Sequence, residues 1–377
     1  MGLHMLRKLA LGAVLALALS ACQEAKLGGS NRHLAPVPPT TVALMASKGV
    51  SASDPVVMRS YKKEAEIELW KKAADGKYVH LKTYPICRWS GQLGPKVREG
   101  DRQAPEGFYD VTPGAMNPNS SLYLSFNLGY PNEYDREHGR TGAHIMVHGQ
   151  CSSRGCYAMT DEAMSEVYAL TREAFASGQR SIQFQSYPFR MTAENLAKHR
   201  RDPHIAFWRN LKEGSDEFDV SGEAPRVSVV AGRYAFNGGQ ASAAAASKRA
   251  KDDREVAELV AKGTPAIKLA YEDGGQHPVF RELLAASSVA GEGSFAVLGM
   301  QGGRSKLGEV SRPDALPGGP REIALHLDLP PSARPSVLAG RAQVGADGVP
   351  PGRSPLPEPA KLERSKAKDG NSRGALR

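Results

Sequence analysis

Alternation of apolar and polar residues marks the first regular part of the chain. Residues 65–70 and 78–84 alternate in this way and flank Asp75-Gly76, a pair typical of tight turns between antiparallel strands. These two runs therefore predict a β-hairpin. Further strands are predicted over three apolar runs bounded by Pro, Gly, Asn or Asp, at 107–111, 122–127 and 143–148.

The period then changes to that of a helix. Ala163, Val167, Leu170 and Ala174 recur at helical spacing, which predicts a helix over 161–176 with Thr160 or Asp161 as its N-cap. The fold continues to about residue 236 through a strand at 182–186, a helix at 193–198 and the stretch 207–211. The pattern as a whole predicts an α+β protein that is mainly β with flanking helices.

Both ends of the chain lack this patterning. Residues 23–55 are rich in Ala, Pro, Ser and Thr, which predicts an extended tether without a core. Beyond residue 236 the chain has Ala/Ser/Gly repeats, a charged stretch at 248–262 and Pro/Gly-rich sequence. We therefore expect a low-complexity, largely disordered tail over 237–377, in which 253–259 could form a short helix.

The N-terminus predicts export and lipidation. Arg7 and Lys8 precede an apolar run, Leu9 to Leu19, that is too short to span a bilayer and is typical of a signal peptide. The run closes with Leu-Ser-Ala-Cys at 19–22, which resembles the lipobox of bacterial lipoproteins. We expect removal of residues 1–21 and a lipid anchor on Cys22, at the periplasmic face of the envelope; Gln23 favours the outer membrane. The alternative is an ordinary signal peptide with an incidental Cys.

Composition narrows the choice of partner only slightly. The 377 residues carry a formal net charge of +9, which suits an anionic partner such as a nucleic acid, a phospholipid surface or an acidic polymer. Much of this charge lies near the ends, however, and the stretch 248–262 mixes both signs. Export argues against nucleic acid as well, so none is expected.

The segment 145–159 has the layout of an acyl-transfer site. An apolar strand ends in His148, Gly149 follows, and a short loop returns Gly155-Cys156 ahead of the predicted helix. A neighbouring imidazole or a helix N-terminus lowers the pKa of a thiol, and Gly155 would let backbone N–H groups point at an oxyanion. This predicts Cys156 as nucleophile and His148 as base. The structural alternative is a chance His–Cys spacing with a Cys151–Cys156 disulfide.

A metal site is not expected near His148. In a strand, His144, Met146 and His148 share one face, but no Asp, Glu or further His follows at ligand spacing. We therefore expect neither a metal nor a cofactor.

Five segments carry a resemblance to a known family, from about residue 61 to 236: 84–87, 90–96, 100–109, 125–132 and 148–159. In these the chain resembles the L,D-transpeptidase catalytic-domain (YkuD-type) family and its YafK-like branch. The resemblance implies a β-sandwich or barrel-like domain with a Cys nucleophile and a His base. It also implies that a diaminopimelate acyl group of a peptidoglycan stem peptide passes to the Cys and then to an amine or water.

Residue by residue, Cys156 and His148 match the family's nucleophile and base, and Gly149 and Gly155 match its glycines. Typical members read Ser-His-Gly-Cys, an apolar residue and Arg, whereas this chain has Arg154 for the His and Ala158 for the Arg. Carboxylate recognition is therefore expected to differ.

The usual spacing of base and nucleophile also points to a rival base, His138, which lies in a polar loop; we favour His148 because an apolar strand holds it. Basic residues in family-like loops could bind diaminopimelate carboxylates or be solvated: Arg88, Lys96, Arg98 and Arg140. Cys87 is interpreted as a strand residue or as a disulfide partner of Cys151, with Cys156 left free.

The expected organisation follows from these assignments: signal peptide 1–21, tether 22–55, catalytic domain 56–190, family-like extension 191–236 and tail 237–377. The expected activity is that of a peptidoglycan L,D-transpeptidase working through a Cys acyl-enzyme. Two alternatives stay open. One is a hydrolase of the same fold that cleaves stem peptides or links between envelope proteins and diaminopimelate, and the other is a non-catalytic peptidoglycan-binding lipoprotein.

Overall fold

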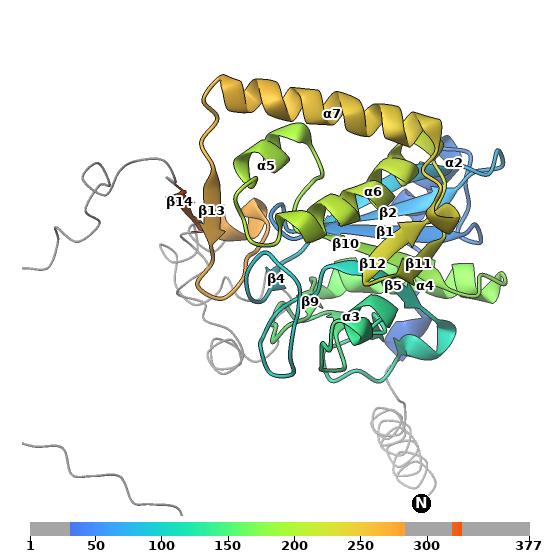
Figure 1. Ribbon diagram of the computed structural model, residues 1–377. Coiled ribbons are helices and arrows are strands. Elements are labelled where there is room, and N and C mark those ends of the chain that lie inside the picture. Colours follow the sequence, from blue (N-terminus) through green and yellow to red (C-terminus); the bar gives the residue numbers. More distant parts are fainter. Residues whose placement is uncertain (1–30, 283–318, 326–377) are drawn as a thin grey trace, which may run out of the picture. The chain divides into compact units, whose positions relative to one another are not determined.

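The structure is a computed structural model that describes residues 31–282 and 319–325 (Figure 1). The chain divides into two compact units, residues 1–327 and 328–377, and all described residues belong to the first. Two five-stranded sheets form its centre. The predicted signal peptide and Cys22 lie outside the described residues.

The first sheet has the strand order β3-β2-β1-β10-β5. The predicted hairpin is confirmed, because β2 and β3 pair antiparallel, and β1 pairs parallel with β10. All six residues of β1 are buried, so this central strand shows no alternation and was missed. The strands are β1 (Val56–Tyr61), β2 (Glu66–Lys72), β3 (Tyr78–Pro85), β5 (Gly107–Val111) and β10 (Ile182–Tyr187).

The second sheet, of order β4-β9-β8-β7-β6, is built from shorter strands. Strands β7 and β8 confirm two predicted strands but start later, because Tyr123 and His144 have φ of 70° and 57°, which interrupts an extended backbone. The strands are β4 (Arg88–Trp89), β6 (Met116–Asn117), β7 (Ser125–Asn127), β8 (Met146–His148) and β9 (Tyr157–Ala158).

Contacts between β9 and β10 hold the two sheets together. The Tyr157 hydroxyl lies 2.7 Å from Ser186 Oγ, and the Tyr157 ring packs on Phe184 with centroids 5.8 Å apart. In the described part of the chain the sheets do not close into a barrel. Two further sheets have two antiparallel strands each. One pairs β11 (Val227–Val230) with β12 (Arg233–Phe236), and the other pairs β13 (Ile267–Ala270) with β14 (Arg321–Ala324).

Helices surround the sheets, which confirms the α+β fold class. Helix α4 (Asp161–Ala176) has the predicted bounds, and Thr160 caps it by accepting a hydrogen bond from the Ala163 N–H. The remaining helical segments of this part are η3 (Pro113–Ala115), α3 (Glu133–Glu137), α5 (Ala193–Lys198) and α6 (Ile205–Ser221), of which α6 is longer than the predicted stretch 207–211.

The prediction of a coreless tether is wrong for its second half. Residues 31–34 form a 3-10 turn, η2 (Asn31–Leu34), and α2 (Pro39–Ser47) follows. Met45 is buried, and Thr41 Oγ1 donates a 2.6 Å hydrogen bond to Glu166 of α4. Because this partner lies 125 residues away, the local composition gave no sign of it.

The prediction of a disordered tail is wrong for residues 237–282. Turn η4 (Asn237–Gly239) leads into helix α7 (Ala243–Ala261), which Ser242 caps and which runs along α5 and α6 (Figure 1). Lys248 of α7 pairs with the buried Asp216 of α6 at 2.8 Å. Strands β13 and β14 also lie in the predicted tail, whereas residues 283–318 and 326–377 lie outside the described residues.

Candidate active site

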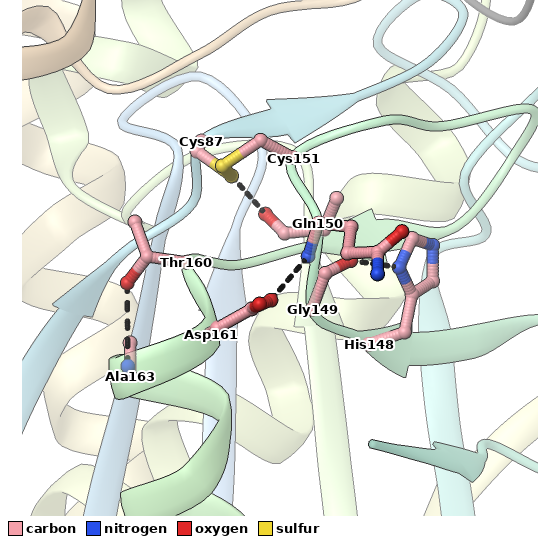
Figure 2. Close-up of a disulfide and its surroundings, with 9 residues drawn as sticks. Cys87, His148, Gly149, Gln150, Cys151, Thr160, Asp161 and Ala163 are labelled. Atoms are coloured by element: carbon pink, nitrogen blue, oxygen red, sulfur yellow. Dashed lines mark hydrogen bonds between the residues drawn. A yellow bond between two sulfur atoms is a disulfide. The ribbon is translucent and has the colours of Figure 1, made fainter. Parts of the chain in front are cut away.

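His148 ends β8 in the middle of the second sheet. Its register partners are Ser125 of β7 and Ala158 of β9, and only 1% of its surface is exposed. Nδ1 lies 2.6 Å from the Gly149 carbonyl oxygen (Figure 2), so Nδ1 carries the proton and donates to that oxygen. Burial lowers the pKa of His148 to about 4. At neutral pH the imidazole is therefore uncharged, with the lone pair on Nε2.

Cys156 directly precedes β9 and contacts β8. Its Sγ accepts a hydrogen bond from the Met146 N–H at 3.4 Å and lies 3.8 Å from the His144 carbonyl oxygen. Since β8 and β9 pair in parallel with Val147 opposite Tyr157, the next pair along places Cys156 beside Met146, two residues from His148. The structure thus places Cys156 just before β9, two register positions from His148 at the end of the neighbouring strand β8.

The protonation of Cys156 differs from the expectation. Burial raises the pKa of the thiol above its ordinary value, although the Met146 N–H and the Lys96 ammonium oppose this. The expected helix N-terminus does not lie beside Cys156, because β9 intervenes and α4 begins only at Asp161. The described site therefore pairs a neutral thiol with a neutral imidazole.

A side chain is excluded by close contacts at Gly149 and disfavoured by the backbone conformation at Gly155. A Cβ on Gly149 would lie 2.5 Å from Asp161 Oδ1 and 2.9 Å from Tyr123 Cβ. Gly155 has φ of 122°, a conformation that L-residues rarely adopt, and its Cβ would lie 3.4 Å from the Gln103 carbonyl oxygen. These residues are thus required for the shape of the loop.

Ser153, which the sequence reasoning missed, organises the loop around the nucleophile. Its Oγ accepts from the N–H groups of Gly155 at 3.2 Å and Cys156 at 3.0 Å. The same hydroxyl bonds the Cys156 carbonyl oxygen at 2.7 Å and Ser90 Oγ at 2.8 Å. The two N–H groups expected at an oxyanion are therefore bonded to Ser153. A Ser side chain often accepts a hydrogen bond from a backbone N–H two or three residues later in a turn. The position of Ser153 could therefore have predicted these bonds from the sequence.

A disulfide fixes the other side of this loop. Cys87 and Cys151 are bonded, with Cα atoms 5.3 Å apart (Figure 2). Cys156 is free. This is one of the pairings left open by the sequence, and it satisfies the expectation that Cys156 stays unpaired. The Gln150 N–H also donates to Asp161 Oδ1 at 2.9 Å, which ties the loop to the start of α4 (Figure 2).

The rival base His138 sits on a different element. It caps the C-terminus of α3, where its Nδ1 lies 2.9 Å from the Tyr134 carbonyl oxygen. The imidazole stacks on the Tyr134 ring with centroids 4.1 Å apart. His138 is thus held at the end of α3, whereas His148 ends β8 and Cys156 directly precedes the neighbouring strand β9.

Three of the four basic candidates are engaged in buried ion pairs. Arg88 pairs with Asp273 at 3.2 Å, Lys96 with Asp101 at 2.5 Å and Arg140 with Asp135 at 2.8 Å. Arg98 is exposed. Within residues 31–282 and 319–325, His, Cys, Asp and Glu do not gather into a group of three or more that could hold a metal.

Comparison with known proteins assigns the family. Residues 50–178 match the L,D-transpeptidase catalytic domain, YkuD. The chain is 42% identical over 230 residues to the protein described as "Putative L,D-transpeptidase YafK" of Escherichia coli K12, an alignment that covers 61% of this chain and 90% of that protein. The protein from Escherichia coli O157:H7 matches with the same values. The chain therefore belongs to the L,D-transpeptidase family, whose members act on peptidoglycan stem peptides.

Solved structures share a lower sequence identity with this chain. The helical cell shape determining protein Pgp2 from Campylobacter jejuni is 16% identical with a TM-score of 0.28, and the match covers 61% of this chain and 80% of that one. Bdellovibrio bacteriovorus Bd1075 is also 16% identical, with a TM-score of 0.25 and coverage of 45% and 62%.

Proposed function

We propose that this protein is a peptidoglycan acyl transferase that forms an acyl-enzyme on Cys156, with His148 as the base. The observation that carries the proposal is a free thiol placed beside the strand that ends in a neutral imidazole. Because Nδ1–H is bonded to Gly149, the free lone pair is on Nε2, the atom that can take a proton. The family supplies the substrate class.

The first half-reaction transfers an acyl group to sulfur. His148 Nε2 takes the thiol proton as Sγ attacks the carbonyl of diaminopimelate, and the D-alanine amine leaves with that proton. Proton transfer has to accompany the attack, because both partners are neutral at rest. The product is a thioester on Cys156.

The second half-reaction depends on the acceptor. An amine or water attacks the thioester carbonyl and His148 takes its proton. The Cys156 thiolate then leaves and receives that proton from His148. An amine of another stem peptide gives a cross-link, a Lys of an envelope protein gives covalent anchoring, and water gives hydrolysis.

Mass spectrometry tests this function. The full chain is incubated with a tetrapeptide muropeptide containing diaminopimelate and with a muropeptide linked to a Lys. His148→Gln and His138→Gln form a matched pair, and Cys156→Ala is the blank. We expect exchanged, cross-linked or hydrolysed products with the wild type and with His138→Gln, and none with the other two. Unchanged turnover in Cys156→Ala would refute the nucleophile and favour a binding scaffold.

We also propose that the protein works outside the cytoplasm, held to the outer membrane by lipid on Cys22. The Cys87–Cys151 disulfide supports this, because such bonds persist in oxidising compartments. Among the described residues, the helices are too short or too polar to cross a bilayer.

A further inference from the structure

A row of three side chains crosses the second sheet at the candidate site. His148 of β8 is the register partner of Ala158 of β9, and Ala158 is the partner of Arg88 of β4. Directly paired residues project from the same face of a sheet, so the three side chains share one face. With strands about 4.8 Å apart, the Cα atoms of His148 and Arg88 are about 10 Å apart. The methyl group of Ala158 is all that lies between them in this row.

Arg88 is a buried cation with unused hydrogen-bonding capacity. It is fully buried, and its Nε and Nη1 have no hydrogen-bond partner among the described residues. Buried donors are normally bonded, so two free ones on one guanidinium are unusual. Burial lowers the pKa of Arg88 to about 10, which still leaves it protonated at neutral pH.

The guanidinium of Arg88 forms an ion pair with the carboxylate of Asp273. Arg88 Nη2 donates to Asp273 Oδ2 at 3.2 Å, and the Arg102 guanidinium donates to the same carboxylate. Arg102 is 40% exposed, and its neighbour Gln103 contacts the loop at Gly155. Two guanidiniums from separate segments thus converge on one carboxylate beside the nucleophile loop, an arrangement suited to carboxylate recognition.

Asp273 belongs to a segment that lies on the edge of the sheet. The Trp89 N–H donates to the Gly275 carbonyl oxygen at 2.9 Å, and the Gly275 N–H returns a bond of 3.0 Å. Around these bonds, Tyr271 packs on Trp89 and hydrogen-bonds Gln92. Among the described residues, this segment pairs with β4 only through the isolated bridge between Trp89 and Gly275. It therefore makes fewer backbone hydrogen bonds to the sheet than a full strand would.

We propose that Arg88 and Arg102 form a carboxylate-binding subsite of the enzyme, which Asp273 occupies at rest and which a free carboxylate of the stem peptide takes by displacing it. The inference rests on the proposed function for the identity of the ligand. In this proposal, the segment 271–276 competes with the substrate for the two guanidinium groups.

Binding to an inactive protein tests the proposal without requiring turnover. Full-length Cys156→Ser is titrated calorimetrically with a tetrapeptide muropeptide, alone and combined with Asp273→Asn. Loss of the internal competitor is expected to tighten binding about tenfold, the order of one charge-assisted hydrogen bond. Glu258→Gln, which removes an equal charge from the exposed face of α7, should leave the dissociation constant unchanged.

Two further arms identify the carboxylate. Muropeptides amidated either at diaminopimelate or at D-glutamate are titrated against the same proteins. Asp273→Asn should not tighten binding of the ligand that lacks the recognised carboxylate, but it should still tighten binding of the other. Arg102→Gln, at a partly exposed residue whose loss should not unfold the protein, is expected to weaken binding of the unmodified ligand about tenfold.

The outcomes separate this inference from the proposed function. Asp273→Asn that leaves binding unchanged, or that tightens all three ligands equally, would overturn the subsite even if Cys156-dependent turnover is found. The expected pattern together with an absence of turnover would keep the subsite and reject the catalytic proposal. Circular dichroism and melting curves of each variant show whether a loss of binding is a loss of fold.

Discussion

Protonation of single residues decides how Cys156 can act. The thiol is partly shielded from water and the imidazole of His148 is buried, so desolvation acts on both and favours their neutral forms. A resting thiolate–imidazolium pair is therefore disfavoured. Catalysis by this pair needs the substrate in place before the proton moves, and a thiol that stays neutral until then reacts slowly with other electrophiles.

Alkylation kinetics test this protonation state. Iodoacetamide modification of Cys156, followed by peptide mass spectrometry over a range of pH, is expected to rise with an inflection at higher pH than in an unstructured Cys peptide, because burial raises the pKa of the thiol above its ordinary value. At pH 7 the rate should fall below that of an unstructured Cys peptide. An inflection below pH 8 would contradict the neutral pair and restore a preformed thiolate.

Ser153 gives a second prediction at the residue scale. Its hydroxyl occupies the position in which an oxyanion would accept from the Gly155 and Cys156 N–H groups. Ser153→Ala removes this internal acceptor and the bond to the Cys156 carbonyl, so the loop loses its geometry. We expect kcat to fall about 10- to 100-fold, within the range for misplaced catalytic groups. Ser181→Ala, outside the loop, is the control, and an unchanged kcat for Ser153→Ala would exclude the role.

At the scale of elements, helix α7 shows how the tail is attached. Lys248 contacts Asp216 at 2.8 Å and Asp252 at 2.7 Å, and Lys212 of α6 shares both carboxylates. Asp216 is fully buried, and both ammonium groups pair with its carboxylate. The helix is thus anchored by a charge cluster as well as by Ala245 and Val256.

Chemical denaturation measures that anchor. Lys248→Met leaves the buried Asp216 with one cation instead of two and is expected to lower the free energy of unfolding by about 2 kcal/mol. Lys251→Met, on the exposed face of the same helix, should change it by less than about 0.5 kcal/mol. Equal effects of the two substitutions would mean that the ion pairs do not hold α7.

The sequence pattern predicted those helices and strands that are marked by signals within their own residues. The hairpin β2–β3 and helix α4 carry turn, cap and periodicity signals of their own, and Cys156 and His148 stood out through their motif. Strand β1 did not, because it is buried along its whole length and shows no alternation. Helix α2 and the first part of the tail did not, because their partners lie far away in sequence: Glu166 for Thr41, Asp216 for Lys248 and Trp89 for Gly275. The pKa values of the site depend on burial, which the sequence does not show.

At the scale of the whole molecule, two buried imidazoles couple folding to pH. Burial lowers the pKa of both His148 and His199 to about 4, against about 6.5 in the unfolded chain. Between these values the unfolded state binds more protons, so stability falls as pH drops from about 6.5 towards 4. The free energy of unfolding should decrease by about 2 kcal/mol per residue between pH 7 and pH 5.

His199→Phe tests this coupling away from the nucleophile. His199 stacks on Phe189 and meets Trp208 edge-on, so a phenyl ring can take its place without a charge. Urea unfolding at pH 7 and pH 5 should show a loss on acidification smaller by about 2 kcal/mol than in the wild type. If the two losses are equal, His199 is not a neutral buried group in the folded protein.

The proposed anchor sets where the folded unit can reach its substrate. A lipid on Cys22 would leave only residues 23–30 between the membrane and the first described turn at Asn31, and eight extended residues span at most about 29 Å. The catalytic loop would then work close to the outer membrane, within range of peptidoglycan strands and of envelope proteins bound to them. Cys22→Ala removes the thiol that would carry the lipid, so it is expected to abolish incorporation of a radiolabelled fatty acid, while purified activity stays unchanged. Equal labelling of the two proteins, or no labelling of the wild type, would exclude the lipid anchor. Recovery of the wild type in the inner membrane fraction would exclude the outer membrane.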